Sequence, residues 1–124
     1  MVINKLIQPF AEKNKSSINS AETFQNAIIR ERCLSDRNNH GFSLVRFNII
    51  SHNDIDCFSL EQLIEILSNR KRDVDIIGRQ SNKNEMSVLL PDTDNDGARN
   101  FTRRIVKEFE NVASCIDYKI STYP

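Results

Sequence analysis

The sequence has little glycine, with three residues in 124. A glycine-rich loop of the kind that cradles phosphates cannot be assembled from so few, and no serine lies in a nucleophile-elbow motif. The chain also has no apolar run long enough for a signal peptide or a membrane-spanning helix. The lack of such an apolar run predicts a cytoplasmic protein without a membrane segment.

Neither sign of charge is in excess, because 17 basic residues balance 17 acidic ones. A chain without net charge has no long-range field that would gather nucleic acid or an anionic membrane surface. We therefore expect no nucleic-acid partner, and any anion site must be local.

Cysteine is scarce as well, and the three residues Cys33, Cys57 and Cys115 lie far apart. An odd number of cysteines without a metal-type pair argues against a disulfide framework or a zinc site. The sequence predicts free, buried thiols in a reducing compartment.

The length and composition fit one globular domain, since 39% of the 124 residues are hydrophobic and 27% are charged. Residues 11–21 are polar and show little periodicity, so we assign residues 1–21 to an N-terminal arm or linker. The domain is expected to span residues 22–124.

Periodic apolar residues predict the elements of this domain. Helical spacing predicts a first helix over residues 20–37 with Ser20 as its N-cap, a second from Ser59 to about Asn69, and a third after Asp94. Their apolar faces are Phe24, Ala27, Ile28 and Leu34; Leu60, Leu63, Ile64 and Leu67; and Ala98, Phe101, Ile105 and Phe109. Strands are expected at residues 42–50, 74–79, 85–90 and 116–120, with the middle two forming a hairpin around a turn at residues 81–84.

This order predicts an α+β fold with a ferredoxin-like βαββαβ core and an extra N-terminal helix. Right-handed crossovers place the two helices of the core on one face of a four-stranded antiparallel sheet.

Four features give the chain a more specific resemblance. They are the opening strand from Phe42 to Asn48, the RxxD pattern of Arg72 and Asp75, the run Val88-Leu89-Leu90-Pro91, and the loop from Pro91 to Ala98. In this order and spacing they resemble the GGDEF (diguanylate cyclase) family of the nucleotide cyclase superfamily.

The signature turn of that family is degenerate here. Alignment on Val88 to Pro91 places Met86 at the phenylalanine, Glu85 at the glutamate, Asn84 at the metal-binding acid, and Asn82 and Lys83 at the two glycines. Asn48 likewise stands where the family carries a metal-binding aspartate. Cyclisation of a nucleoside triphosphate needs carboxylates that hold divalent cations and glycines that admit the nucleotide. The resemblance therefore implies a scaffold without catalytic residues, bound metal or cofactor.

Arg72 and Asp75 match a site at which the family binds cyclic di-GMP, and Arg79 follows four residues after the aspartate. We interpret these residues either as a ligand site for cyclic di-GMP or another nucleotide, or as a salt bridge at a solvated helix end.

A calcium loop is a further alternative, because residues 92–97 match the first half of an EF-hand loop. However, Arg103 stands at the twelfth position, which should be a glutamate. We therefore predict a turn and helix N-cap here, with Asp94 and Asp96 complementing the helix dipole.

The leading functional hypothesis is an inactive GGDEF-like domain that acts as a regulatory or protein-interaction module in bacterial signalling or exopolysaccharide systems, with a protein partner or a second copy of itself. The alternatives are a sensor of cyclic di-GMP or another nucleotide, a weakly active diguanylate cyclase, and an unrelated ferredoxin-like binding domain.

Overall fold

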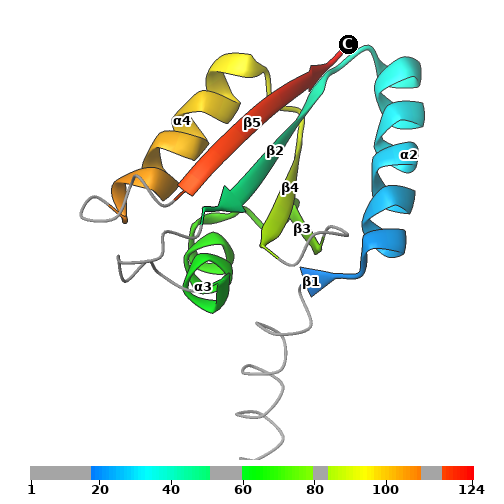
Figure 1. The fold of residues 1–124 in the computed structure, drawn as a ribbon. Coiled ribbons are helices and arrows are strands. Elements are labelled where there is room, and N and C mark those ends of the chain that lie inside the picture. Colours follow the sequence, from blue (N-terminus) through cyan, green and yellow to red (C-terminus); the bar gives the residue numbers. More distant parts are fainter. Residues whose placement is uncertain (1–17, 51–59, 80–83, 110–115) are drawn as a thin grey trace, which may run out of the picture.

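The computed structural model describes residues 18–50, 60–79, 84–109 and 116–124. The elements in these ranges are β1 (Ile18–Asn19), α2 (Ala21–Asn38), β2 (Phe42–Ile49), α3 (Leu60–Arg70), β3 (Ile76–Arg79), β4 (Glu85–Pro91), α4 (Asn95–Lys107) and β5 (Ile116–Tyr123) (Figure 1). The predicted α+β class and the βαββαβ order from β2 onward are confirmed. No helix within the described ranges combines the length and the apolar character needed to cross a membrane.

The strands form one sheet in the order β1-β3-β4-β2-β5. β2 lies between β4 and β5 and is antiparallel to both, and β3 and β4 form the predicted hairpin. The sheet differs from the four-stranded antiparallel prediction in one respect: β1 adds a fifth strand, parallel to β3. Ile18 and Asn19, which fall within the expected arm, thus pair with the sheet.

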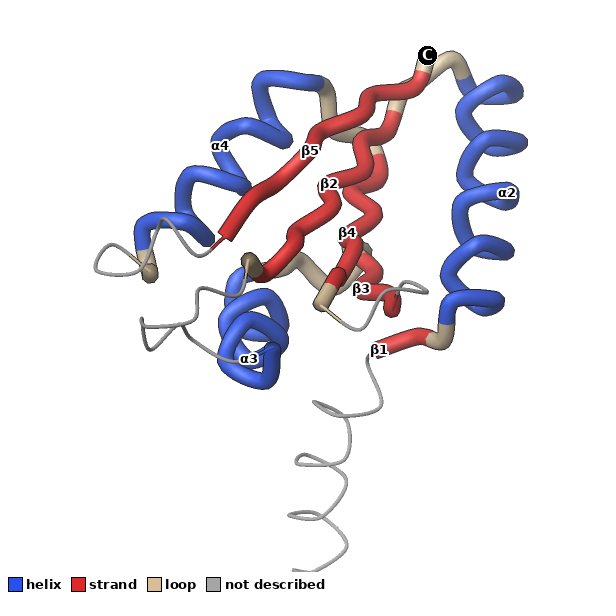
Figure 2. The backbone as a smooth tube through the Cα atoms, in the orientation of Figure 1, coloured by secondary structure: helices blue, strands red, loops and turns tan. Residues whose placement is uncertain are grey.

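Helices cover both faces of the sheet, as Figure 2 shows. Leu63 and Leu67 of α3 and Phe101 and Ile105 of α4 join one buried cluster, so the two helices of the core share a face as predicted. α2 packs on the other face, where Phe24 and Ala27 meet Phe42 and Leu89. Strand residues alternate between faces, and β2 accordingly sends Phe42 toward α2 and Phe47 toward α3 and α4.

Two helix starts follow their capping residues. The Ser20 side chain accepts a hydrogen bond from the Thr23 amide, as the predicted N-cap of α2 should. At α4, Asp94 Oδ1 accepts a hydrogen bond of 2.8 Å from the Gly97 amide. The predicted turn and N-cap are confirmed here, with Asp94 as the cap and Asp96 in the first turn of the helix. Ser59, the predicted cap of α3, lies outside the described residues, as does most of the predicted turn at residues 81–84.

Loss of the α4 cap is expected to lower the free energy of unfolding moderately. The Asp94→Ala variant should lose about 1 kcal/mol of unfolding free energy, because the Gly97 amide loses its acceptor. The matched control is Asp96→Ala, which removes an acid from the same first turn and should cost less, about 0.3–1 kcal/mol through the helix dipole. Urea unfolding of both variants measures the difference, and equal losses would contradict the cap.

Several residues are more exposed than the sequence predicted. Val74 was placed in a strand, but β3 begins at Ile76 and Val74 is exposed, because residues 72–75 form a turn. Leu34 lies on the predicted apolar face of the first helix and Tyr118 in the predicted last strand, but both are exposed. Cys33 is an exposed free thiol, so the prediction of a buried one was wrong there, because it lies on the outer side of α2. Cys57 and Cys115 lie outside the described residues.

Candidate functional site

The RxxD residues form a closed turn before β3. The Asp75 carboxylate is buried and accepts hydrogen bonds from the Arg72 backbone amide at 2.8 Å and from Arg72 Nη2 at 2.9 Å. The Asp75 amide returns a bond of 3.0 Å to the Arg72 carbonyl. The predicted salt bridge between the two residues is therefore present, and it is local to the turn.

The Arg72 guanidinium also ties this turn to the end of β4. Its Nη2 donates to the Pro91 carbonyl at 2.8 Å and to Thr93 Oγ1 at 2.9 Å. Thr93 Oγ1 itself donates to the Pro91 carbonyl at 2.9 Å. Arg72 thus links the start of β3 to the loop that enters α4, which makes it a structural residue whatever else it binds.

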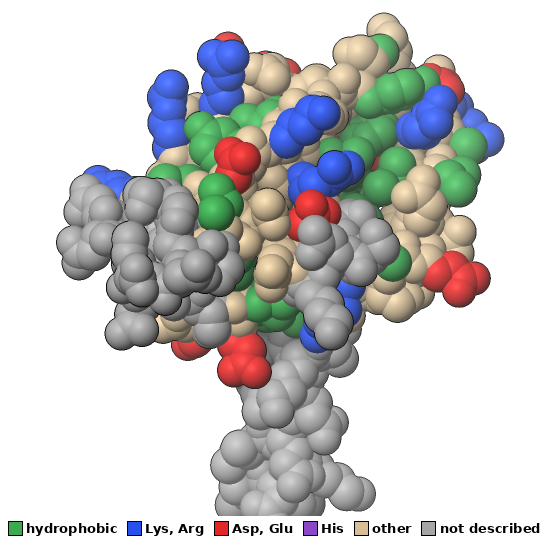
Figure 3. Space-filling view, viewed as in Figure 1, with side chains coloured by type: hydrophobic (Ala, Val, Ile, Leu, Met, Phe, Trp, Pro, Cys, Tyr) green, Lys and Arg blue, Asp and Glu red, His purple; other side chains and the backbone are tan. Residues whose placement is uncertain are grey.

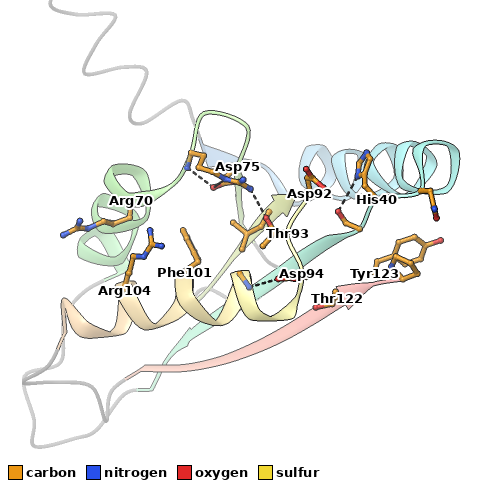
Figure 4. A pocket seen from close by; sticks show the side chains of 16 residues that line it. His40, Arg70, Asp75, Asp92, Thr93, Asp94, Phe101, Arg104, Thr122 and Tyr123 are labelled. Carbon is orange, nitrogen blue, oxygen red and sulfur yellow. Dashed lines mark hydrogen bonds and ion pairs between the residues drawn. The ribbon is translucent and has the colours of Figure 1, made fainter.

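A pocket of about 750 Å³ opens beside this turn. Arg70, Arg72 and Asp75 line it from the α3 to β3 segment, Arg104 and Phe101 from α4, and Thr122 and Tyr123 from the end of β5. Figure 4 shows Arg70 and Arg104 at one end of the pocket and Tyr123 at the other. The volume lies within the range of small-molecule sites.

The cations of the pocket differ in how they are engaged. Arg70 is paired with the Glu108 carboxylate, and Arg72 with Asp75. Arg104 has no hydrogen-bond or ion-pair partner within the part of the chain that the structure describes. Arg104 is therefore the arginine of this pocket best placed to bind an anion.

The positions that the resemblance assigns to the signature turn and the metal lie at the other end of the sheet. Asn48 of β2 stands directly opposite Glu85 of β4, and the Asn84 carbonyl accepts a hydrogen bond of 2.9 Å from the Ile49 amide. The structure thus brings together Asn48, Asn84 and Glu85, the positions that the resemblance assigns to the metal and the signature. Asn82 and Lys83 lie outside the described residues.

This end of the sheet is poor in metal ligands. In the ranges that the structure describes, no three side chains of His, Cys, Asp or Glu come together as a metal site would require. Asn48 brings an amide oxygen without charge and stands between Glu85 and Asp117 in the sheet, and Asn84 precedes Glu85 in the chain.

Arg79 stands apart from Arg72 and Asp75. It ends β3 and pairs with Met86, whereas the turn of Arg72 and Asp75 precedes the strand. The pocket that contains Arg72 and Asp75 does not include Arg79.

No motif in the sequence pointed to Arg104 or Thr93, or to Phe101 as a pocket residue. Phe101 was predicted to face the core, and it does. Arg104 follows it by three residues, which puts both on neighbouring parts of the helix surface. That spacing was visible in the sequence, but which strand ends adjoin that part of α4 was not.

No protein-family model and no curated protein sequence matches the chain. Solved structures do. A DGC protein from Thermotoga maritima has a TM-score of 0.69 and 16% identity over 86% of this chain and 82% of that one. The GGDEF domain of FimX from Pseudomonas aeruginosa has a TM-score of 0.72 and 11% identity over 85% and 75%.

The chain has the fold of a GGDEF domain. The same fold occurs in the diguanylate cyclase SiaD from Pseudomonas aeruginosa, solved in complex with its activator SiaC, at a TM-score of 0.61 and 15% identity over 83% of this chain and 45% of that chain. At these identities the similarity concerns the fold alone. The chemistry must therefore be argued from the residues that this GGDEF fold carries.

Proposed function

We propose that this chain is a non-catalytic domain of the GGDEF fold that acts as a regulatory or protein-interaction module. The observation that carries the proposal is the pairing of Asn48 with Glu85 beside Asn84. At the two positions that the resemblance assigns to metal-binding acids, the chain has uncharged amides.

The charge of these positions decides the chemistry. Magnesium prefers hard, charged oxygen ligands, and a cyclase must also neutralise a triphosphate. Asparagine can offer a carbonyl oxygen but no negative charge, so the attraction for a divalent cation falls sharply when both acids are absent. Glu85 and Asp117 flank Asn48 in the sheet, but no third Asp, Glu, His or Cys joins them among the described residues.

Manganese binding tests this explanation directly. The unaltered protein is expected to show no saturable Mn²⁺ binding in the millimolar range by electron paramagnetic resonance. The Asn48→Asp, Asn84→Asp double variant should gain such binding, because two carboxylates then adjoin Glu85. The matched control is the double variant Asp92→Asn, Asp96→Asn, which changes two exposed carboxylates elsewhere and should leave Mn²⁺ binding unchanged.

Saturable Mn²⁺ binding by the unaltered protein, lost in Glu85→Gln, would contradict the proposal. Circular dichroism and the melting temperature, recorded on the same samples, show whether the double variant is folded.

A non-catalytic module of this kind would act by binding another protein. SiaD, which has the same fold, was solved with a protein activator. By analogy, the partner of this chain is a protein or a second copy of the chain, in a bacterial signalling or exopolysaccharide system.

The pocket beside Arg72 favours a second function, a sensor of cyclic di-GMP or another nucleotide. Arg104 points into a pocket of about 750 Å³ without a partner among the described residues, and an arginine can bind a phosphate through two hydrogen bonds and stack on a base. This proposal extends the one inferred from Arg72 and Asp75 alone.

Calorimetry with cyclic di-GMP tests this second function. Arg104→Ala is expected to weaken binding by about tenfold to a hundredfold, the effect of losing one charged hydrogen bond of about 1.5–3 kcal/mol. Arg99→Ala on the same helix, which does not line this pocket, should bind as the unaltered protein does. Absence of heat with the unaltered protein would remove the sensor hypothesis, and equal binding by both variants would remove Arg104 from the site.

A further inference from the structure

α2 covers only part of its face of the sheet. Beside it lies a hollow of about 260 Å³ over β2, β4 and β5. Its floor carries Arg46, Lys119, Ser87 and Ser121, and its apolar wall includes Ile28 and Leu44. No aspartate or glutamate of the described ranges lines it. This hollow is separate from the pocket at Arg72 and from the signature positions.

Two cations face each other across the floor. Arg46 of β2 stands directly opposite Lys119 of β5 in the antiparallel register, so both side chains project from the same face. Both residues are exposed, and neither has a hydrogen bond or ion pair with another described residue. Figure 3 shows basic side chains over the middle of the sheet, with apolar side chains beside them and an acidic one directly below.

Such a pair is unfavourable in the absence of an anion. Like charges directly opposite each other in a sheet destabilise it, whereas opposite charges stabilise it. The next row on the same face, Glu85, Asn48 and Asp117, brings two acids. The Asp117 carboxylate accepts a hydrogen bond of 2.9 Å from the Tyr118 amide, and neither acid forms an ion pair with either cation.

We propose that Arg46 and Lys119 form a binding site for the phosphate group of a small organic phosphate. A guanidinium binds two phosphate oxygens at once, and a lysine ammonium adds a compact charge. The Ser121 hydroxyl on the same floor can donate a further hydrogen bond. Ile28 and Leu44 then contact the organic part of the ligand. A hollow of about 260 Å³ limits that part to a small group. The site does not rest on the function proposed above.

Thermal unfolding with phenyl phosphate as the probe tests the site, with chloride at matched ionic strength as reference. At about ten times the dissociation constant the melting temperature of the unaltered protein should rise by several degrees. The double variant Arg46→Gln, Lys119→Gln should show no rise. Inorganic phosphate should give a smaller rise than phenyl phosphate, because it leaves the wall of Ile28 and Leu44 unused.

The same variant has an effect of opposite sign without the ligand. Removal of the repulsion between two facing cations should raise its melting temperature by about 1–4 °C in chloride alone. A loss of ligand response together with a gain in stability cannot be explained by misfolding, which would lower both.

A control variant separates this site from the other basic residues. Lys107→Gln removes an exposed cation of α4 that does not line the hollow, and it should keep the full rise with phenyl phosphate. Amide chemical shifts of Arg46, Lys119 and Ser121 should move during the titration. The proposal is overturned by no rise in the unaltered protein, by a rise that persists in the double variant, or by equal rises with phenyl and inorganic phosphate.

Discussion

The Gly78→Ala variant is expected to lose about 3 kcal/mol of unfolding free energy, the upper part of the usual range for overpacking. A Cβ atom at Gly78 would lie 2.1 Å from Cγ and 2.2 Å from Cδ1 of Phe24. Phe24 is buried and anchors α2 to the sheet. The added methyl group would therefore force α2 away from β3. Urea unfolding measures the loss.

A double-mutant cycle attributes this loss to Phe24. Phe24→Ala alone should cost about 3–5 kcal/mol through the cavity that it leaves. In the double variant Phe24→Ala, Gly78→Ala the methyl group added to β3 partly occupies that cavity, so the combined loss should be smaller than the sum of the single losses. Additive losses would contradict the contact.

A second glycine provides a matched control. Gly97 lies in the first turn of α4, where an added Cβ would be 2.9 Å from the Thr93 methyl carbon. Alanine gains about 1 kcal/mol of helix propensity over glycine, which offsets the strain of this milder contact. Gly97→Ala should therefore change the unfolding free energy by less than about 1 kcal/mol.

Loss of the Arg72 side chain should have an effect of similar size. Arg72→Ala is expected to cost about 3 kcal/mol, because it leaves the Asp75 carboxylate, whose side chain is 1% exposed, without its counter-charge. The same change removes the hydrogen bonds to the Pro91 carbonyl and to Thr93. Denaturant unfolding at neutral pH measures the cost.

Arg70 is the matched control for this change. Its side chain is 53% exposed, as is that of Arg72, but its partner Glu108 is 36% exposed. Exposed ion pairs contribute little, so Arg70→Ala should cost less than about 1 kcal/mol. The double variant Arg72→Ala, Asp75→Asn should recover part of the loss, because no charge is then stranded. Equal losses for Arg70→Ala and Arg72→Ala would contradict a structural role of the RxxD turn.

These expectations change how the RxxD pattern should be tested for ligand binding. A variant of Arg72 would lose stability and binding together, and the two effects could not be separated. Arg104 has no such structural partner among the described residues, so it is the better probe of the pocket.

The sequence predicted the elements of the core well, because each has a local cause. Ser20 and Asp94 are strong N-caps, and the apolar spacing of Leu63 and Leu67 or of Phe101 and Ile105 identifies the buried helix faces. The βαββαβ order then leaves few topologies, which is why the sheet order of β2 to β5 could be anticipated.

Non-local features were harder to predict. β1 consists of two residues and has no pattern of its own; it exists because Ile18 and Asn19 meet the free edge of β3. Tyr118 lies on the face of β5 that strand alternation predicts, but it is 48% exposed. Alternation predicts the face of the sheet on which a side chain lies, and it does not predict how much of that face other elements cover.

The candidate sites also differ in this way: groupings within one short segment could be predicted, and groupings between distant segments could not. The turn of Arg72 and Asp75 is contained in four residues and could be inferred from them. The grouping of Asn48 with Asn84 and Glu85 was implied only by the family resemblance. The presence of Arg104 in the pocket that Arg72 lines, and of Arg46 opposite Lys119, depends on which elements adjoin in space. No local pattern encodes this.

Product analysis after incubation with GTP tests the central claim, that this GGDEF fold does no cyclase chemistry. The protein is incubated with GTP and Mg²⁺ or Mn²⁺, and cyclic di-GMP is quantified by mass spectrometry beside an active diguanylate cyclase. No cyclic di-GMP above the level of a heat-denatured sample is expected, because amides stand at both metal positions. Formation of cyclic di-GMP that the Glu85→Gln variant loses would contradict the account.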